Sequence, residues 1–203
     1  VRYGQYKPKK EQGRGVAVLV RHRIIRFSLV SIITGVVRTS VVFWMPTYIA
    51  QYLGFSAERS AGIFTAASFV ISMTAFVAVF LYERLGHNMD LTMQIAFVGS
   101  AVFFLLTYFV KAPFLNIVFF VLAVMASNCA ASMLWSRYCP SLRDTGMVST
   151  ATGFLDFLSY AAASATSTLF AEAVTTIGWG NLILVWAGLM FVGIIVALPY
   201  RSF

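Results

Sequence analysis

The chain has 203 residues, of which 60% are hydrophobic and only 11% are charged. About a quarter of the residues of a soluble domain carry a charge, so this composition excludes an ordinary soluble protein and indicates an integral membrane protein. The net charge is +8, but the basic residues cluster beside apolar runs, where membrane topology explains them better than nucleic-acid binding does. We therefore expect no nucleic-acid partner.

The first 26 residues form a basic, polar stretch without the layout of a signal peptide. Because the chain begins with Val1, we expect a piece of a longer polypeptide. Residues 16–26 mix apolar and basic side chains, which predicts a short interfacial helix at the anionic inner leaflet. Residues 1–26 are therefore expected to be cytoplasmic.

Six apolar runs are long enough to cross a bilayer, because about 20 helical residues span its hydrocarbon core of ~30 Å. They lack the alternation of barrel strands and are predicted to be helices, separated by turns rich in glycine, proline and asparagine. The predicted fold is an all-α integral membrane bundle with spans at 27–50, 61–82, 91–110, 114–136, 146–171 and 181–199.

The distribution of lysine and arginine predicts the orientation of these spans. If the amino-terminal stretch is cytoplasmic, the segments on its side hold twelve of these residues, and the loops on the opposite side hold only Arg59 and Lys111. Positive charge concentrates on the cytoplasmic side of membrane proteins. We expect a multi-pass protein of the cell (inner or plasma) membrane with both ends, including the tail 200–203, in the cytoplasm.

One arginine interrupts the first apolar run near its middle. Arg38 lies ~17 Å along the helix from residue 27, close to the bilayer midplane. A charge at that depth costs several kcal/mol unless it is paired or hydrated. Arg38 is therefore expected to face a polar cavity or a buried partner, and its planar fork, which donates two parallel hydrogen bonds to phosphate or carboxylate, favours an anionic ligand.

An acidic residue lies at nearly the same depth in another run. Asp156 is ~15 Å from the start of the run 146–171. We hypothesise that Arg38 and Asp156 pair across the bundle in at least one state, which lowers the cost of burying either. The pair could serve only to orient two helices. Alternatively, Asp156 could neutralise empty Arg38 until substrate displaces it, or could accept a proton that is carried along.

Other polar residues are candidates for lining the same path. Tyr48 follows Arg38 by ten residues, near a whole number of turns, and Tyr160 follows Asp156 by one turn. Asn128 lies midway along the run 114–136, where interhelical hydrogen bonding is the alternative role. Pro46 removes a helical hydrogen bond and predicts a kink that could serve an outer gate.

These residues carry a resemblance to a known family. The segment from Arg38 through Trp44, Pro46 and Tyr48 (RTSVVFWMPTY) resembles the seventh helix of major facilitator superfamily transporters, in the spacing of the organophosphate:phosphate antiporter branch. The stretch 53–62 resembles the following loop, 143–180 resembles helix eleven and its exit, and 81–86 (LYERLG) is similar to a cytoplasmic GxLxDRxG motif in which Glu83 replaces the aspartate.

The resemblance implies a fold, a function and roles for several residues. Residues 27–199 would form the carboxy-terminal half of a twelve-helix bundle, built as a 3+3 inverted repeat, and residues 1–26 would be the central loop before it. The chain would need the missing amino-terminal six-helix half as its partner, and would move a small organic or phosphorylated anion by alternating access. Arg38 would bind the anionic group, and Glu83 with Arg84 would form a cytoplasmic gate.

Two other functions remain open at this stage. A proton-coupled carboxylate or drug carrier would use Asp156 as its titrating group, with Arg38 tuning it. A membrane sensor built on a transporter fold would bind the same anion but signal through a partner. Binding without flux in reconstituted vesicles would distinguish the sensor, and proton uptake would distinguish the carrier.

Enzyme and metal chemistry find no support in the residues. His22 and His87 lie in predicted loops without ligand spacing, and Cys129 and Cys139 are ~15 Å apart on one helix, too far for a disulfide between them. No phosphate loop, nucleophile elbow, metalloprotease motif or paired acidic motif is present in the sequence. We expect no enzymatic activity, no cofactor and no metal site.

Overall fold

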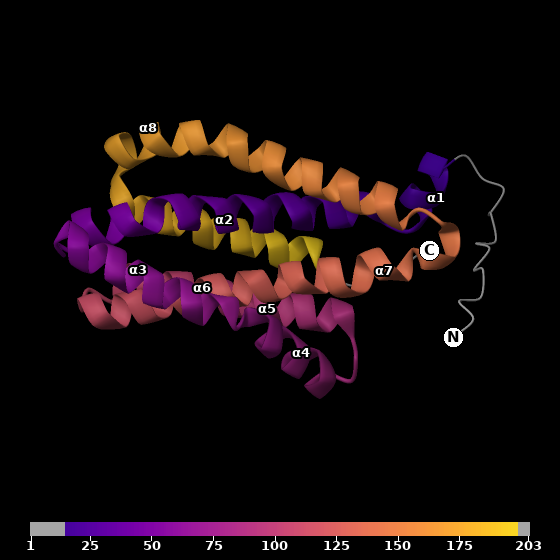
Figure 1. The fold of residues 1–203 in the computed structure, drawn as a ribbon, viewed down its shortest axis with the longest axis horizontal. Coiled ribbons are helices and arrows are strands. Elements are labelled where there is room, and N and C mark those ends of the chain that lie inside the picture. Colours follow the sequence, from indigo (N-terminus) through magenta and orange to yellow (C-terminus); the bar gives the residue numbers. More distant parts are fainter. Residues whose placement is uncertain (1–14, 199–203) are drawn as a thin grey trace, which may run out of the picture.

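The computed structural model describes residues 15–198, and every regular element within that range is helical. The expected tail at 200–203 and residues 1–14 of the basic amino-terminal stretch lie outside the described residues. The long helices run nearly side by side in an elongated bundle (Figure 1). The elements are α1 (Gly15–Arg21), α2 (Ile24–Gln51), α3 (Ala57–Ser72), α4 (Thr74–Arg84), α5 (Met89–Phe109), α6 (Pro113–Met133), a π-helical turn (Leu134–Tyr138), α7 (Cys139–Ser141), a 3-10 turn (Arg143–Thr145) and α8 (Val148–Val196).

Local sequence explains where several helices begin. The side chains of Ser56 and Asn88 accept hydrogen bonds from the N–H groups of Arg59 and Leu91, and so cap α3 and α5. Pro113 stands at the start of α6, where its missing N–H costs nothing. The breaks predicted between the runs 27–50 and 61–82, 61–82 and 91–110, and 91–110 and 114–136 are confirmed.

Five helical stretches among the described residues are long and apolar enough to cross a membrane, whereas the sequence predicts six. They are Ile24–Gln51, Ala57–Arg84, Met89–Phe109, Pro113–Ser141 and Val148–Val196. The difference arises in α8, which contains both of the last two predicted runs. Only Gly178 within it leaves helical geometry (φ 76°, ψ 167°), a backbone conformation that glycine adopts without steric cost.

Gly178 divides α8 into a first arm, residues 148–177, and a second arm, residues 179–196. The chain reverses between them, so that the first arm (orange) and the second arm (yellow) run back along each other (Figure 1). Phe170 of the first arm stacks on Trp186 of the second, with ring centroids 5.6 Å apart. The Trp186 indole N–H also donates to Ser40 Oγ of α2, at 3.0 Å. The two arms are therefore packed on each other and on α2.

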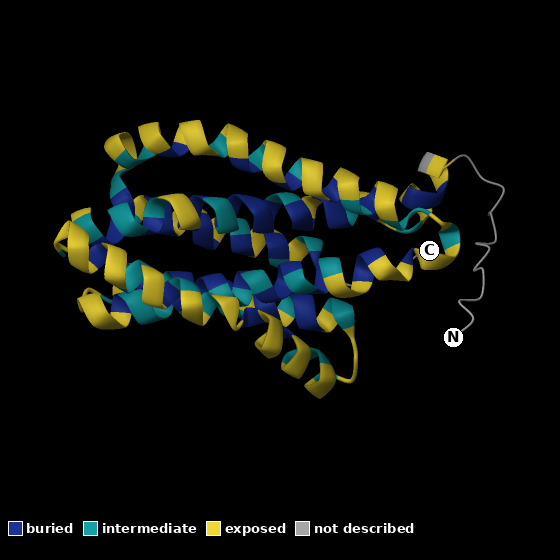
Figure 2. Cartoon of the chain, viewed as in Figure 1, coloured by how far each residue is buried: buried dark blue, intermediate teal, exposed yellow. Residues whose placement is uncertain are grey.

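Burial is uneven among the helices. Most of α2 is buried, whereas α3 and α4 together bury only Ser60, Ala67, Thr74 and Ala78, and the first arm of α8 is largely exposed along one side (Figure 2). Large apolar side chains such as Phe69, Phe76 and Phe157 account for much of this exposed surface. Apolar exposure of this extent is expected of helices that face lipid or another membrane-embedded segment.

The first arm of α8 approaches α2 closely at Gly35. A Cβ atom built on Gly35 would lie 3.0 Å from the Ser159 carbonyl oxygen and would also collide with the Ser159 side chain. One turn earlier on α2, Ser31 Oγ donates to the Leu155 carbonyl at 2.8 Å. Glycine and serine thus allow two backbones to meet, as is usual where membrane helices associate.

At one end of the bundle, Arg26 joins three helices. Its Nε and Nη2 atoms donate to the carbonyls of Val196 and Ala197 at the end of α8, at 2.8 and 2.7 Å. Its Nη1 atom lies 3.1 Å from Asp90 Oδ1 in the first turn of α5. Gln94 adds a further hydrogen bond to the Ala197 carbonyl, at 3.0 Å. We call this the Arg26 end of the bundle, where α2 and α5 begin and α8 ends.

The close approach at Gly35 can be tested by substitution. Gly35→Ala should lower the free energy of unfolding by about 1–3 kcal/mol, because the added methyl group must push α2 and the first arm apart. Gly188→Ala is the matched control, since no atom lies within 4 Å of a Cβ at that position, and alanine is the better helix former. Thermal unfolding in detergent would measure both. Equal melting temperatures for the two variants would contradict the packing described here.

Candidate functional site

Arg38 is half-buried on α2 and contacts an aromatic ring of the first arm of α8. Its Cζ atom lies 5.7 Å from the ring centroid of Tyr160, which is itself 58% exposed. A guanidinium at this distance from an aromatic face is held by a cation–π interaction. The structure thus brings together two of the residues that the sequence singled out, Arg38 and Tyr160.

Asp156 is exposed and lies one turn before Tyr160 on the first arm. It therefore projects from the same side of that helix. No ion pair or hydrogen bond joins Asp156 to Arg38, or to any other residue that the structure describes. The pairing hypothesised between these two charges is absent from this conformation and stays a prediction for another one.

The face formed by Arg38, Tyr160 and Asp156 is open in the part of the chain that is described. Arg38 has no carboxylate partner there, and its recorded contact is the Tyr160 ring. A charge at mid-span costs several kcal/mol against hydrocarbon, so a water-filled cavity or another protein segment must adjoin this face in a membrane. This open face carrying a cation and an anion is the candidate site.

Asn128 lies half-buried on α6. Its backbone carbonyl accepts a hydrogen bond from Ser132 Oγ at 2.9 Å, but its side-chain amide bonds to no described residue. The neighbouring Ser127 hydroxyl is buried without a partner in the same range. Asn128 therefore forms no interhelical hydrogen bond with a described residue, which was its alternative role. The N–H donors and the oxygen acceptor of its side-chain amide remain available for another partner.

The structure places Tyr48 in the packed interior, apart from Arg38. Tyr48 is 1% exposed, and its hydroxyl donates to Asn116 Oδ1 at 2.5 Å. Its ring stacks on Tyr52 and on Phe120, with centroids 5.2 and 5.1 Å away. Ten residues correspond to about 2.8 helical turns, which leaves the two side chains about 80° apart around α2. That angle explains why Tyr48 points into the core and Arg38 does not.

Asn116, which the sequence analysis did not select, organises this part of the core. Its amide group donates to the carbonyls of Thr107 and Val110, at 2.7 and 2.9 Å, and thereby satisfies the end of α5. Its Oδ1 atom accepts the bond from Tyr48. Asn116 lies near the beginning of α6, where a polar residue is unremarkable, so its position carried no sign of this role.

The residues proposed for gating are distributed over two regions. Pro46 lies inside α2, which remains one helical element from Ile24 to Gln51. Glu83 and Arg84 are both exposed at the end of α4, where Arg84 Cζ lies 5.4 Å from the Phe80 ring. Neither Glu83 nor Arg84 forms an ion pair with a described residue. The expected clasp between charges is thus not formed in this conformation.

A different contact joins that end of α4 to the π-helical turn. Arg137 Cζ lies 4.2 Å from the Tyr82 ring centroid, and His87 packs edge-on against the same ring at 5.1 Å. A π-helical turn inserts an extra residue and shifts the direction of the side chains that follow it. This cluster could not be predicted from the sequence. A single arginine on an apolar helix does not indicate that a π-helical turn will direct its side chain toward Tyr82.

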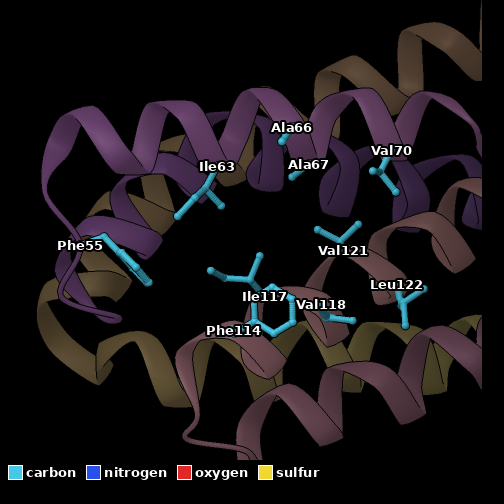
Figure 3. A pocket seen from close by; sticks show the side chains of 10 residues that line it. All are labelled: Phe55, Ile63, Ala66, Ala67, Val70, Phe114, Ile117, Val118, Val121 and Leu122. Carbon is cyan, nitrogen blue, oxygen red and sulfur yellow. The ribbon is translucent and has the colours of Figure 1, made fainter.

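A groove between α3 and α6 has a volume of about 500 Å³ but no polar group suited to an anion (Figure 3). Side chains of α3 and α6, together with Phe55 from the loop before α3, point into it. The lining consists of Phe55, Ile63, Ala66, Ala67, Val70, Phe114, Ile117, Val118, Val121 and Leu122. Recognition of a charged ligand needs placed donors or charges, so this groove is not the site of anion binding.

No known protein family matches this chain. No curated protein is significantly similar to it in sequence. What the chain does must therefore be argued from its own residues and their placement.

The structural role of Tyr48 leads to a measurable prediction. Tyr48→Phe should lower the free energy of unfolding by about 1–3 kcal/mol, because Asn116 Oδ1 is left buried without its donor. Tyr52→Phe is the control: among the described residues the Tyr52 hydroxyl accepts a single, exposed hydrogen bond, from Lys111 at 3.1 Å, so its loss should cost far less. Both variants can be compared by thermal unfolding in detergent. A larger effect of Tyr52→Phe would contradict this assignment.

Proposed function

We propose that this chain is the carboxy-terminal half of a secondary active transporter of the major facilitator type, and that it moves a small organic or phosphorylated anion by alternating access. The observation that carries the proposal is Arg38, a cation at mid-span of α2 without a carboxylate partner among the described residues. An anionic substrate would complete its hydrogen bonds and neutralise its charge. The resemblance of the segment 38–48 to a transporter helix supports the same reading.

The arrangement of the helices is compatible with two three-helix units of opposite orientation. The first unit would be α2, α3 with α4, and α5, and the second would be α6 and the two arms of α8. Inverted repeats of this kind place substrate near the bilayer centre, on broken or close-packed helices. The reversal at Gly178 supports this division, because it converts one 49-residue helix into two membrane-length arms.

The amino-terminal half of the transporter is the proposed neighbour of the open face. Arg38 and Asp156 lie on a face that hydrocarbon solvates poorly. A second bundle facing them across a hydrated cavity would remove this cost and would supply the other wall of the substrate path. The helices α3 and α4 and the first arm also expose apolar surfaces, which suit contact with further membrane helices (Figure 2).

A proton-coupled carrier is the second candidate, and Asp156 is the observation that favours it. Its carboxylate is exposed on the open face, forms no ion pair there, and is one turn from the ring that holds Arg38. A carboxylate in that position can take up a proton when the cavity opens to the acidic side. The two candidates use the same face but differ in what Asp156 does during the cycle.

Arg38→Lys tests the anion site. In vesicles containing the complete protein, the exchange of labelled inorganic phosphate for a sugar phosphate should lose affinity by about 10- to 100-fold, because lysine keeps the charge but not the two parallel hydrogen bonds. The control is Arg59→Lys, at an exposed position in the first turn of α3. Competition with a dicarboxylate would show whether phosphate is preferred. Unchanged affinity in Arg38→Lys would remove Arg38 from the site.

Asp156→Asn distinguishes an exchanger from a proton-coupled carrier. Asparagine has the same shape but cannot ionise, so anion exchange should persist while any proton uptake that depends on Asp156 should be lost. The two quantities can be followed in the same vesicles with a labelled anion and an internal pH dye. Proton uptake that survives in Asp156→Asn would exclude the coupling role of this residue.

A further inference from the structure

The helices α2 and α6 begin at opposite ends of the bundle (Figure 1), and contacts at both ends fix their register. Near the beginning of α2, the Phe27 ring stacks on the Tyr138 ring at the end of the π-helical turn, with centroids 3.6 Å apart. Near the end of α2, Tyr48 bonds to Asn116 and stacks on Phe120, so it lies level with a point midway between them on α6. Each residue of α2 can therefore be matched with the part of α6 beside it.

This register places Arg38 level with Asn128. Arg38 lies ten residues before the Tyr48 contact, and Asn128 lies ten residues beyond the matching point on α6. Counting eleven residues from each ring of the contact at the other end leads to Arg38 and to Ser127. The two counts agree within one residue, and one residue is only ~1.5 Å along a helix.

Arg38 and Asn128 also project to the same side of the contact between α2 and α6. The rings of Tyr48 and Phe120 face each other across that contact. From Tyr48 to Arg38, ten residues fall about 80° short of three turns, and from Phe120 to Asn128, eight residues exceed two turns by about 80°. Both steps run in the same direction along the bundle, so these offsets have opposite senses and lead to the same side.

A small molecule on that side can contact both residues. Helices that pack directly have axes about 8–10 Å apart, which is within the length of a molecule of a few carbon atoms. The Asn128 amide bonds to no described residue, and it offers two donors and an acceptor but no charge. The open face thus combines a cation on α2 with a neutral hydrogen-bonding group on α6.

We infer that Asn128 binds an uncharged polar group of the substrate, such as a hydroxyl, while Arg38 binds its anionic end. This inference rests on the proposed function and narrows the substrate to organic anions that carry a hydroxyl group a few carbon atoms from the charge. Asn128 would be a specificity residue, because a site with an amide there discriminates against an anion whose alkyl chain leaves that amide unpaired.

The test uses pairs of anions that differ by one hydroxyl group. Propyl phosphate and butanoate are each compared with the analogue that carries a terminal hydroxyl, so phosphates and carboxylates are both covered. Dissociation constants would be measured by titration calorimetry on the complete protein in detergent. Asn128→Leu removes the amide at similar size. Ser127→Ala is the control, because Ser127 is 1% exposed and its hydroxyl has no described partner.

The unsubstituted protein should bind the hydroxylated member of at least one pair about 10-fold more tightly, as one hydrogen bond allows. Asn128→Leu should lose this preference but keep its affinity for the alkyl anion, and Ser127→Ala should retain the preference. Thermal unfolding would verify that both variants are folded.

Two results would overturn the inference while leaving anion binding by Arg38 intact. One is equal affinity of the unsubstituted protein for both members of each pair. The other is a preference that survives in folded Asn128→Leu. Equal weakening of both members by Asn128→Leu would also overturn it, and would assign the amide to a hydrogen bond with the amino-terminal half. Binding of none of these anions would contradict the proposed function itself, and this inference with it.

Discussion

The cost of burying an ionised side chain among apolar helices is the constraint that organises this protein, and the two arginines of α2 meet it in different ways. Arg26 is satisfied by two carbonyls at the end of α8 and by Asp90. Arg38, about three turns further along α2, is held only by the face of the Tyr160 ring among the described residues. The chain therefore gives Arg26 two carbonyl acceptors and a carboxylate counter-charge, whereas Arg38 keeps its hydrogen-bonding capacity for another partner.

Much of the secondary structure could be predicted from the sequence, because uninterrupted apolar runs must be helical in a membrane and their ends carry recognisable residues. Ser56, Asn88 and Pro113, residue types that favour helix starts, each stand at the start of a helix. The number of separate helices could not be predicted in the same way. Two runs with a glycine-containing connector predict two helices and a loop, but the reversal at Gly178 needs one residue only, so that the helical hydrogen bonding continues almost to the turn on both sides.

Side-chain placement was less predictable, since a helix that is apolar all round gives no periodic sign of which face is buried. Tyr48 was assigned to the face of Arg38 from its spacing alone, but the 80° offset turns it toward Asn116 and Phe120. Asp156 and Arg38 have matching depths, yet depth along two helices does not fix their rotation. The contact of Arg38 with Tyr160 depends instead on the close approach of α2 and the first arm at Gly35, which only the three-dimensional packing reveals.

That close approach also limits how the candidate site can move. Gly35 lies one turn before Arg38 on α2, and Ser159 immediately precedes Tyr160 on the first arm, so this close backbone approach is directly beside the site. The bond from Ser31 to the Leu155 carbonyl fixes the next turn as well. Arg38, Asp156 and Tyr160 are consequently carried on one packed pair of helices, and closely packed elements change position together. In the proposed transporter, α2 and the first arm would therefore separate little from each other. Alternating access would come instead from rigid-body rocking of the second bundle that faces them.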